Sequence, residues 1–124
     1  MGDAGFRDLL GMDGPTTAEG RARVAVRADE RHVNPSGAVH GGVIATLVDI
    51  AMSAAVQSMS RDDETPVTIE MKVNYLEPGH PGVLVAVADV RKRGRRFTVV
   101  HAEVVQEDDG EVVAVAVGTF TTFG

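Results

Sequence analysis

Apolar and polar residues alternate along five separate stretches of the chain. In residues 21–29, Ala and Val at every second position alternate mostly with arginines, and a period of two places the two sets on opposite faces of a β-strand. Four further alternating stretches, each bounded by turn residues, cover 67–76, 83–92, 97–106 and 111–122. The pattern therefore predicts five strands. The Glu-Asp-Asp-Gly turn before the last stretch favours an antiparallel hairpin.

Residues 42–59, between the first and second of these stretches, are rich in Ala, Val and Met. Their length and pattern predict a helix of about five turns. Apolar residues surround this helix almost completely, which is expected of a helix enclosed by the fold. A short helix is predicted over residues 3–10, which a Gly-Met-Asp-Gly-Pro segment ends. One long helix between strands joined by short turns predicts an α+β fold with a largely antiparallel sheet.

Composition limits the class of protein. The 124 residues are enough for one domain, so we expect a single domain over 1–124. An apolar share of 44% and a charged share of 24% are typical of globular proteins. The absence of cysteine excludes disulfides, thiolate metal sites and a Cys nucleophile, and fits a reducing compartment. Neither a membrane span nor a signal peptide is visible, so we expect a cytoplasmic protein.

Charge is distributed unevenly along this acidic chain. A net charge of −6 argues against nucleic acid as a partner, because phosphate contacts need a positive face. One segment is nevertheless strongly basic. It has two interpretations: a solvated strand edge that discourages aggregation, or a grip for phosphate groups, which we favour. The segment, called the basic turn below, consists of Arg91, Lys92, Arg93, Gly94, Arg95 and Arg96.

Asp49 is the only charged residue of the long predicted helix. Burying an unpaired carboxylate costs free energy, so this group must receive hydrogen bonds, take a proton, or face a cleft that admits water and ligand. A solvated strip along the helix is the alternative without a function. The apolar surroundings favour the cleft, which makes Asp49 the candidate catalytic carboxylate.

The long helix begins at His40, Gly41 and Gly42. The first N–H groups of a helix lack partners within it, and the helix dipole is positive at this end, so the segment can hold a developing oxyanion. A tight turn into the helix explains the two glycines equally well. Asn34 and His40 are polar residues of the preceding loop that could bind a carbonyl or only shape the loop.

Other hydrolase chemistries have weaker support in the sequence. The chain contains no Gly-x-Ser-x-Gly motif, and the spacing of its four histidines does not match that of zinc ligands. We therefore expect neither a serine hydrolase nor a metal site.

The run from Asn34 to Ala51, Asn-Pro-Ser-Gly-Ala-Val-His-Gly-Gly followed by Leu-Val-Asp, resembles the signature of hotdog-fold acyl-CoA thioesterases of the phenylacetate-degradation type. The resemblance extends through residues 66–79, the basic turn and the end of the chain. It implies a five- or six-stranded antiparallel sheet wrapped around a long central helix. It also implies a homodimer with active sites at its interface, commonly assembled into a homotetramer.

The resemblance further implies roles for the residues around the helix. The Gly41 amide, with Gly42 as a second donor, polarises the thioester carbonyl, and Asn34 and His40 line the loop. Asp49 of the opposite subunit then attacks the carbonyl carbon or activates water.

A hydroxyl group is expected near this carboxylate. Thr68 stands where related enzymes place a Ser or Thr that positions the water, and Ser53 stands where another branch has its hydroxyl. We favour Thr68.

The implied substrate is an acyl-CoA, so no separate cofactor is expected. Met52, Val56 and Met59 suggest an apolar acyl pocket, which suits an aryl group or a medium-length alkyl chain. Two alternatives remain: a noncatalytic acyl-CoA-binding module, and a hydratase or dehydratase of the same fold.

Overall fold

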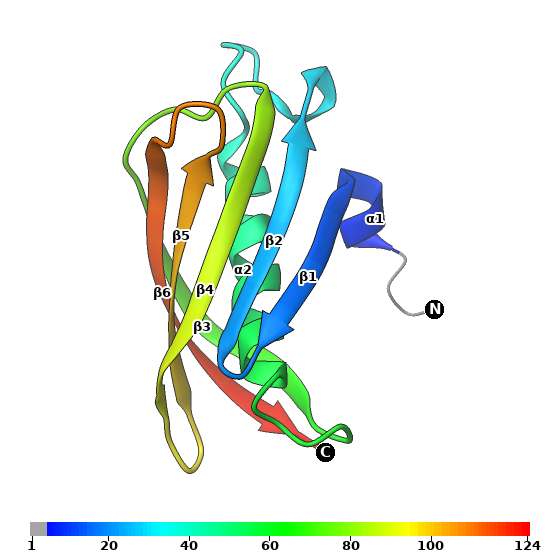
Figure 1. Cartoon of the computed structure of the whole chain (residues 1–124), viewed down its shortest axis with the longest axis vertical. Coiled ribbons are helices and arrows are strands. Elements are labelled where there is room, and N and C mark those ends of the chain that lie inside the picture. Colours follow the sequence, from blue (N-terminus) through cyan, green and yellow to red (C-terminus); the bar gives the residue numbers. More distant parts are fainter. Residues whose placement is uncertain (1–4) are drawn as a thin grey trace.

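A computed structural model describes residues 5–124 (Figure 1). Six strands form one antiparallel sheet in the order β1-β2-β4-β5-β6-β3. The elements are α1 (Phe6–Leu10), β1 (Met12–Ala18), β2 (Arg21–Ala28), the 3₁₀ helix η1 (Glu30–His32), α2 (Gly41–Gln57), β3 (Thr65–Tyr75), β4 (Gly82–Arg93), β5 (Thr98–Gln106) and β6 (Val112–Phe123).

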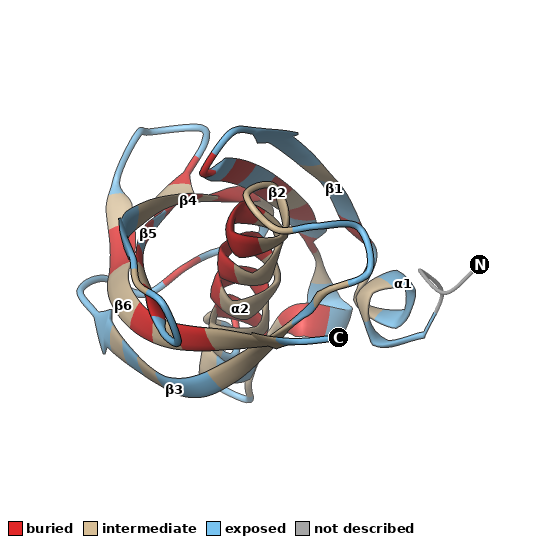
Figure 2. Ribbon diagram, turned by 90° about the horizontal axis from the view of Figure 1, so that it is seen from below, coloured by how far each residue is buried: buried red, intermediate tan, exposed pale blue. Residues whose placement is uncertain are grey.

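The sheet curves around α2, which lies along its concave face (Figure 2). Leu47, Val48, Ala51, Met52 and Ala55 of this helix are fully buried. Along β2 and β5, buried residues alternate with more exposed ones, as expected of strands with one face on a core. The predicted α+β arrangement, with a long helix inside an antiparallel sheet, is confirmed.

The element boundaries agree with the sequence pattern to within a few residues, with one exception. Strand β1 was not predicted, because Gly14 and Pro15 interrupt it and the pattern there does not alternate. It pairs with β2 only, its register shifts between Asp13 and Thr16, and only Met12 is buried. Pro is tolerated at such a bulged edge strand. Residues 3 and 4 of the predicted N-terminal helix lie outside the described residues.

Strand β3 forms the other edge of the sheet. It pairs with β6 on one side, and its register shifts between Thr68 and Glu70, so Ile69 is an extra residue at a bulge. Ile69 and Tyr75 are each 52% exposed. This 11-residue edge with apolar side chains is the kind of surface that proteins normally cover.

Within residues 5–124, none of the helices has both the length and the apolar content that crossing a bilayer requires.

The central position of α2 predicts a large cost for truncating its buried face. Leu47→Ala should lower the free energy of unfolding by about 2–5 kcal/mol, because it leaves a cavity between helix and sheet. Leu9→Ala is the matched control, since Leu9 is 73% exposed and its truncation should change stability by less than about 0.5 kcal/mol. Urea denaturation measures the free energy of unfolding of both variants. Equal losses in Leu47→Ala and Leu9→Ala would contradict the burial of α2 inside the sheet.

Candidate active site

The loop that leads into α2 is organised by the side-chain oxygen of Asn34. This atom accepts hydrogen bonds from the Ser36 amide at 3.0 Å, the Ser36 hydroxyl at 2.6 Å and the Ala38 amide at 3.3 Å. Three donors on one acceptor hold the loop in a single shape. The Asn34 amide nitrogen stays available to a ligand, since no described residue accepts from it.

A buried histidine fastens the same loop to the rest of the fold. His32 is 3% exposed, and its Nε2 lies 2.8 Å from the carbonyl oxygen of Leu10. Its own carbonyl accepts the N–H of His40 at 2.8 Å. Asp29 caps η1, and hydrogen bonds from the Arg31 side chain and backbone lower the pKa of the Asp29 carboxyl to about 2.

His40 caps the first turn of α2. Its Nδ1 accepts the N–H of Gly42 at 2.8 Å, and a side chain at Gly42 would come within 3.0 Å of that nitrogen. The amide of Gly42 is therefore engaged by His40. The N–H of Gly41 has no hydrogen-bond partner among residues 5–124, so it is the donor that this helix end offers to a ligand.

Asp49 lies on the side of α2 that faces β3. The Thr68 hydroxyl donates to Asp49 Oδ1 at 2.7 Å, and both residues are half-buried. In the described part of the chain, no cation pairs with this carboxylate and no donor binds its Oδ2. Ser53, one turn further along α2, is also half-buried and does not contact the carboxylate through a hydrogen bond. Of the two candidate hydroxyls, the structure brings Thr68 to Asp49.

Gly41 and Asp49 lie far apart within one chain. They are eight residues apart on the same helix, which corresponds to about 12 Å along its axis. A carbonyl whose oxygen sits on the Gly41 amide has its carbon out of reach of Asp49, because reacting atoms must approach to about 3–3.5 Å. One protomer therefore does not bring the two groups together at one substrate.

A pocket of about 360 Å³ opens beside the start of α2. Its lining includes Val39, Gly41 and Ile44, together with residues 75–79, which begin with the last residue of β3. Tyr75 also donates a hydrogen bond from its hydroxyl to the Gly41 carbonyl at 2.9 Å. Tyr75 was not predicted as a site residue, because nothing in a strand pattern indicates a contact across 34 residues.

The prediction that Met52, Val56 and Met59 line an acyl pocket is wrong for two of these three residues. Met52 and Val56 are 0% and 3% exposed and belong to the core between helix and sheet. Met59 lines a pocket near the opposite end of α2 from Gly41.

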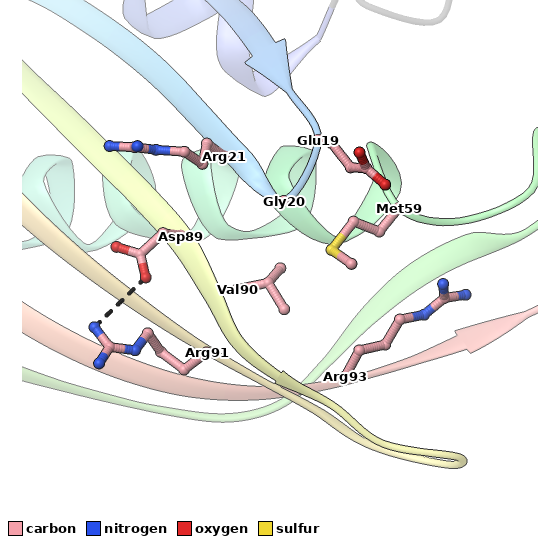
Figure 3. Close-up of a pocket in the computed structure, with 8 residues that line it drawn as sticks. All are labelled: Glu19, Gly20, Arg21, Met59, Asp89, Val90, Arg91 and Arg93. Carbon is pink, nitrogen blue, oxygen red and sulfur yellow. Dashed lines mark ion pairs between the residues drawn. The ribbon is translucent and has the colours of Figure 1, made fainter.

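This second pocket has a volume of about 620 Å³ and lies beside the basic turn (Figure 3). Glu19, Arg21, Arg91 and Arg93 contribute to its lining. Figure 3 shows Arg91 turned toward Asp89, with which it forms an ion pair at 3.7 Å, and Arg93 directed away from that pair.

The basic turn connects β4 and β5 and depends on Gly94. The Gly94 N–H donates to the Phe97 carbonyl at 2.8 Å, and a Cβ at Gly94 would lie only 2.5 Å from that oxygen. Arg95 and Arg96 are exposed at its tip. The hairpin lies near the C-terminal end of α2, whereas Gly41 marks the other end (Figure 1). A single protomer thus separates the arginines from the helix start.

The sequence and the fold of this chain match a known family. Residues 36–113 match the family model described as the thioesterase superfamily. The chain belongs to the thioesterase superfamily. It is a thioester hydrolase with a PaaI-like hotdog fold.

Three relatives illustrate the likeness to this superfamily. Human acyl-coenzyme A thioesterase 13 is 28% identical and aligns with 80% of this chain and 71% of the human protein. The Escherichia coli PaaI protein from the phenylacetic acid degradation operon superposes with a TM-score of 0.86 at 28% identity, covering 95% of this chain and 83% of PaaI. A Bacillus halodurans protein solved with CoA superposes with a TM-score of 0.78 at 36% identity. The superposition covers 82% of this chain and 66% of the Bacillus halodurans chain.

Proposed function

We propose that this thioesterase hydrolyses an acyl-CoA to the free acid and CoA, with Asp49 as the catalytic base. The observation that carries the proposal is a pair of groups on α2. One is the half-buried Asp49 carboxylate, whose single hydrogen-bond donor among residues 5–124 is the Thr68 hydroxyl, and the other is the N–H at the helix start, which has no partner among these residues. Thioester hydrolysis needs a positioned base and a donor for the developing oxyanion, and these two groups supply both.

In the proposed reaction, the thioester carbonyl oxygen binds the Gly41 N–H, where the positive end of the helix dipole adds to the attraction. Asp49 takes a proton from water through Oδ2, while Thr68 holds Oδ1 and so orients the carboxylate. The resulting hydroxide attacks the carbonyl carbon. The tetrahedral intermediate then collapses, its C–S bond breaks, and CoA leaves as a thiolate that needs little acid assistance because thiols are acidic.

A homodimer reconciles this reaction with the distance of about 12 Å between Gly41 and Asp49 along α2. Two β3 edges can pair antiparallel about a two-fold axis, which would cover Ile69 and the unpaired backbone of both edges. Thr68 and Tyr75 lie toward opposite ends of β3, next to Asp49 and Gly41 respectively. The axis would therefore bring Asp49 of one subunit toward Gly41 of the other. Assembly into a tetramer stays a prediction.

The CoA part of the substrate is proposed on two grounds. Human acyl-coenzyme A thioesterase 13 is a relative by sequence, and the Bacillus halodurans relative was solved with CoA. In this chain, the arginines of the basic turn suit the phosphates of CoA. The pocket of about 360 Å³ beside Gly41 has apolar walls that suit an aryl-acetyl or medium-chain acyl group.

The first prediction concerns Asp49. Asp49→Asn should keep acyl-CoA binding and lower turnover by at least about a hundredfold, because an amide cannot take a proton from water. Thiol release from phenylacetyl-, benzoyl- and straight-chain acyl-CoAs, followed with a chromogenic disulfide, measures this. Unchanged turnover in Asp49→Asn would reject Asp49 as the base. A wild-type protein that binds acyl-CoA but releases no thiol would favour a noncatalytic module.

A second prediction isolates the Gly41 N–H. Gly41→Pro and Gly41→Ala both add a Cβ, which would meet the Tyr75 ring at 3.4 Å, but only proline removes the donor. Proline is accepted at the first helical position, and the preceding His40 has the extended ψ of 135° that proline requires. We expect Gly41→Pro to lower kcat about 10²- to 10³-fold and Gly41→Ala to lower it far less.

The Gly41→Pro variant also tests whether each active site is built from two subunits. Mixed dimers of Asp49→Asn and Gly41→Pro chains, purified through two different tags, contain one site with both groups intact if each site uses two subunits. They should recover up to about half of the wild-type rate per dimer. If each site lies within one chain, both sites carry a defect and the mixed dimer stays as inactive as its parents.

A further prediction concerns the basic turn. Replacing Arg93 and Arg95 with Gln should raise KM for acyl-CoA more than for the matching acyl-pantetheine, because only the former carries phosphates. Arg27→Gln, an exposed arginine of β2, is the control. Equal losses for the two substrates would reject the phosphate grip.

A further inference from the structure

Tyr75 and Gly41 meet although they are 34 residues apart in the chain. The Tyr75 hydroxyl donates to the Gly41 carbonyl at 2.9 Å, and its ring lies so near the Gly41 Cα that an added Cβ would be 3.4 Å from Cζ. Tyr75 is the last residue of β3, and it lines the pocket beside the helix start.

The peptide between Gly41 and Gly42 is held at both of its polar ends. Tyr75 binds its carbonyl oxygen, and His40 Nδ1 binds its N–H at 2.8 Å. Because a peptide unit is planar, fixing both ends fixes the orientation of the whole unit. Two successive glycines would otherwise leave this segment unusually free to rotate.

The peptide on the other side of Gly41 begins at His40. The His40 carbonyl of this peptide accepts the N–H groups of Val43 at 2.9 Å and Ile44 at 3.4 Å, so the first turn of α2 holds it. Gly41 is thus anchored before and after its Cα, while its own N–H has no partner among the described residues. Of these anchors, Tyr75 is the one that comes from β3, and it comes from the strand that also carries Thr68.

We propose that Tyr75 is a positioning residue, which aims the Gly41 N–H at the thioester oxygen by holding the carbonyl of Gly41. This inference rests on the proposed function, because it assigns a purpose to the orientation of that donor. Tyr75 does not touch the reacting atoms. The Gly41 N–H binds the developing oxyanion of the transition state more strongly than the neutral carbonyl of the bound substrate, so the loss of the hydroxyl lowers kcat and leaves KM nearly unchanged.

A purely structural role predicts a different result. The hydrogen bond of a half-exposed hydroxyl contributes modestly to folding, and its loss would lower stability without affecting the chemistry. Ser60→Ala is the matched control for this role. The Ser60 hydroxyl donates to the Val56 carbonyl at 2.8 Å, the same kind of bond at the opposite end of α2.

The test compares Tyr75→Phe with Ser60→Ala by thiol release and thermal unfolding. We expect Tyr75→Phe to lower kcat about tenfold, part of the loss typical of removing an oxyanion donor. KM should stay within about twofold. We expect Ser60→Ala to keep the wild-type kcat. A Tyr75→Phe enzyme with wild-type kcat, or a kcat loss in both variants, would overturn the proposal.

A double-mutant cycle identifies the route of the effect. If Tyr75 acts through the Gly41 N–H, then Tyr75→Phe should lower kcat by less than about twofold in a Gly41→Pro enzyme, where that donor is already gone. A full tenfold loss in that background would contradict the proposed route. If the wild type released no thiol, the proposed function would fail together with the inference. If an active, Asp49-dependent enzyme were indifferent to Tyr75→Phe, the inference alone would fail.

Discussion

The burial of α2 inside a curved sheet is the constraint on which the rest of the structure depends. The sequence of this helix is apolar on nearly every side, so it is stable only where strands enclose it. The buried residues of β2, β4 and β5 are accordingly mostly small or β-branched. A helix in this position has its two ends near the two openings of the fold. A single carboxylate, Asp49, then has to lie where the enclosure is incomplete, beside the edge strand β3.

Strand β3 connects the parts of the candidate site that lie far apart in sequence. It runs beside α2 with Thr68 at the carboxylate and Tyr75 at the helix start. The bulge at Ile69 lies directly after Thr68, and bulges of this kind redirect side chains close to active sites. The same strand has an unpaired edge, so a single surface both supports the two polar groups and invites a second subunit.

The groups assigned to the proposed reaction are spread along α2 within one protomer. The free amide of Gly41 is at one end of α2, Asp49 is more than two turns along it, and the basic turn lies near the other end. If the substrate is an acyl-CoA, as proposed, this separation would limit repulsion between the Asp49 carboxylate and the substrate phosphates, which Coulomb interactions would otherwise produce at short range. Under the proposed function, substrate binding and catalysis would depend on how two copies of the chain meet.

Local sequence determined much of this protein. Alternation predicted five of the six strands, the apolar run predicted α2, and the isolated acid and paired glycines selected Asp49 and Gly41 as candidates. Each of these signals comes from neighbouring residues, and the burial of one face or one helix end explains them. Strand β1 was not predicted, because Gly14 and Pro15 interrupt the alternation of apolar and polar residues. An edge strand with one buried residue does not require such an alternation.

Tertiary structure alone decided which distant residues meet. Met52 and Val56 lie in the core rather than in a pocket, and Thr68 rather than Ser53 donates to Asp49. The Gly42 amide donates to His40, and the Tyr75 hydroxyl donates to the Gly41 carbonyl. The physical reason is that a periodic pattern reports which face of an element is buried, whereas contacts between elements depend on the curvature of the sheet and the register of its strands.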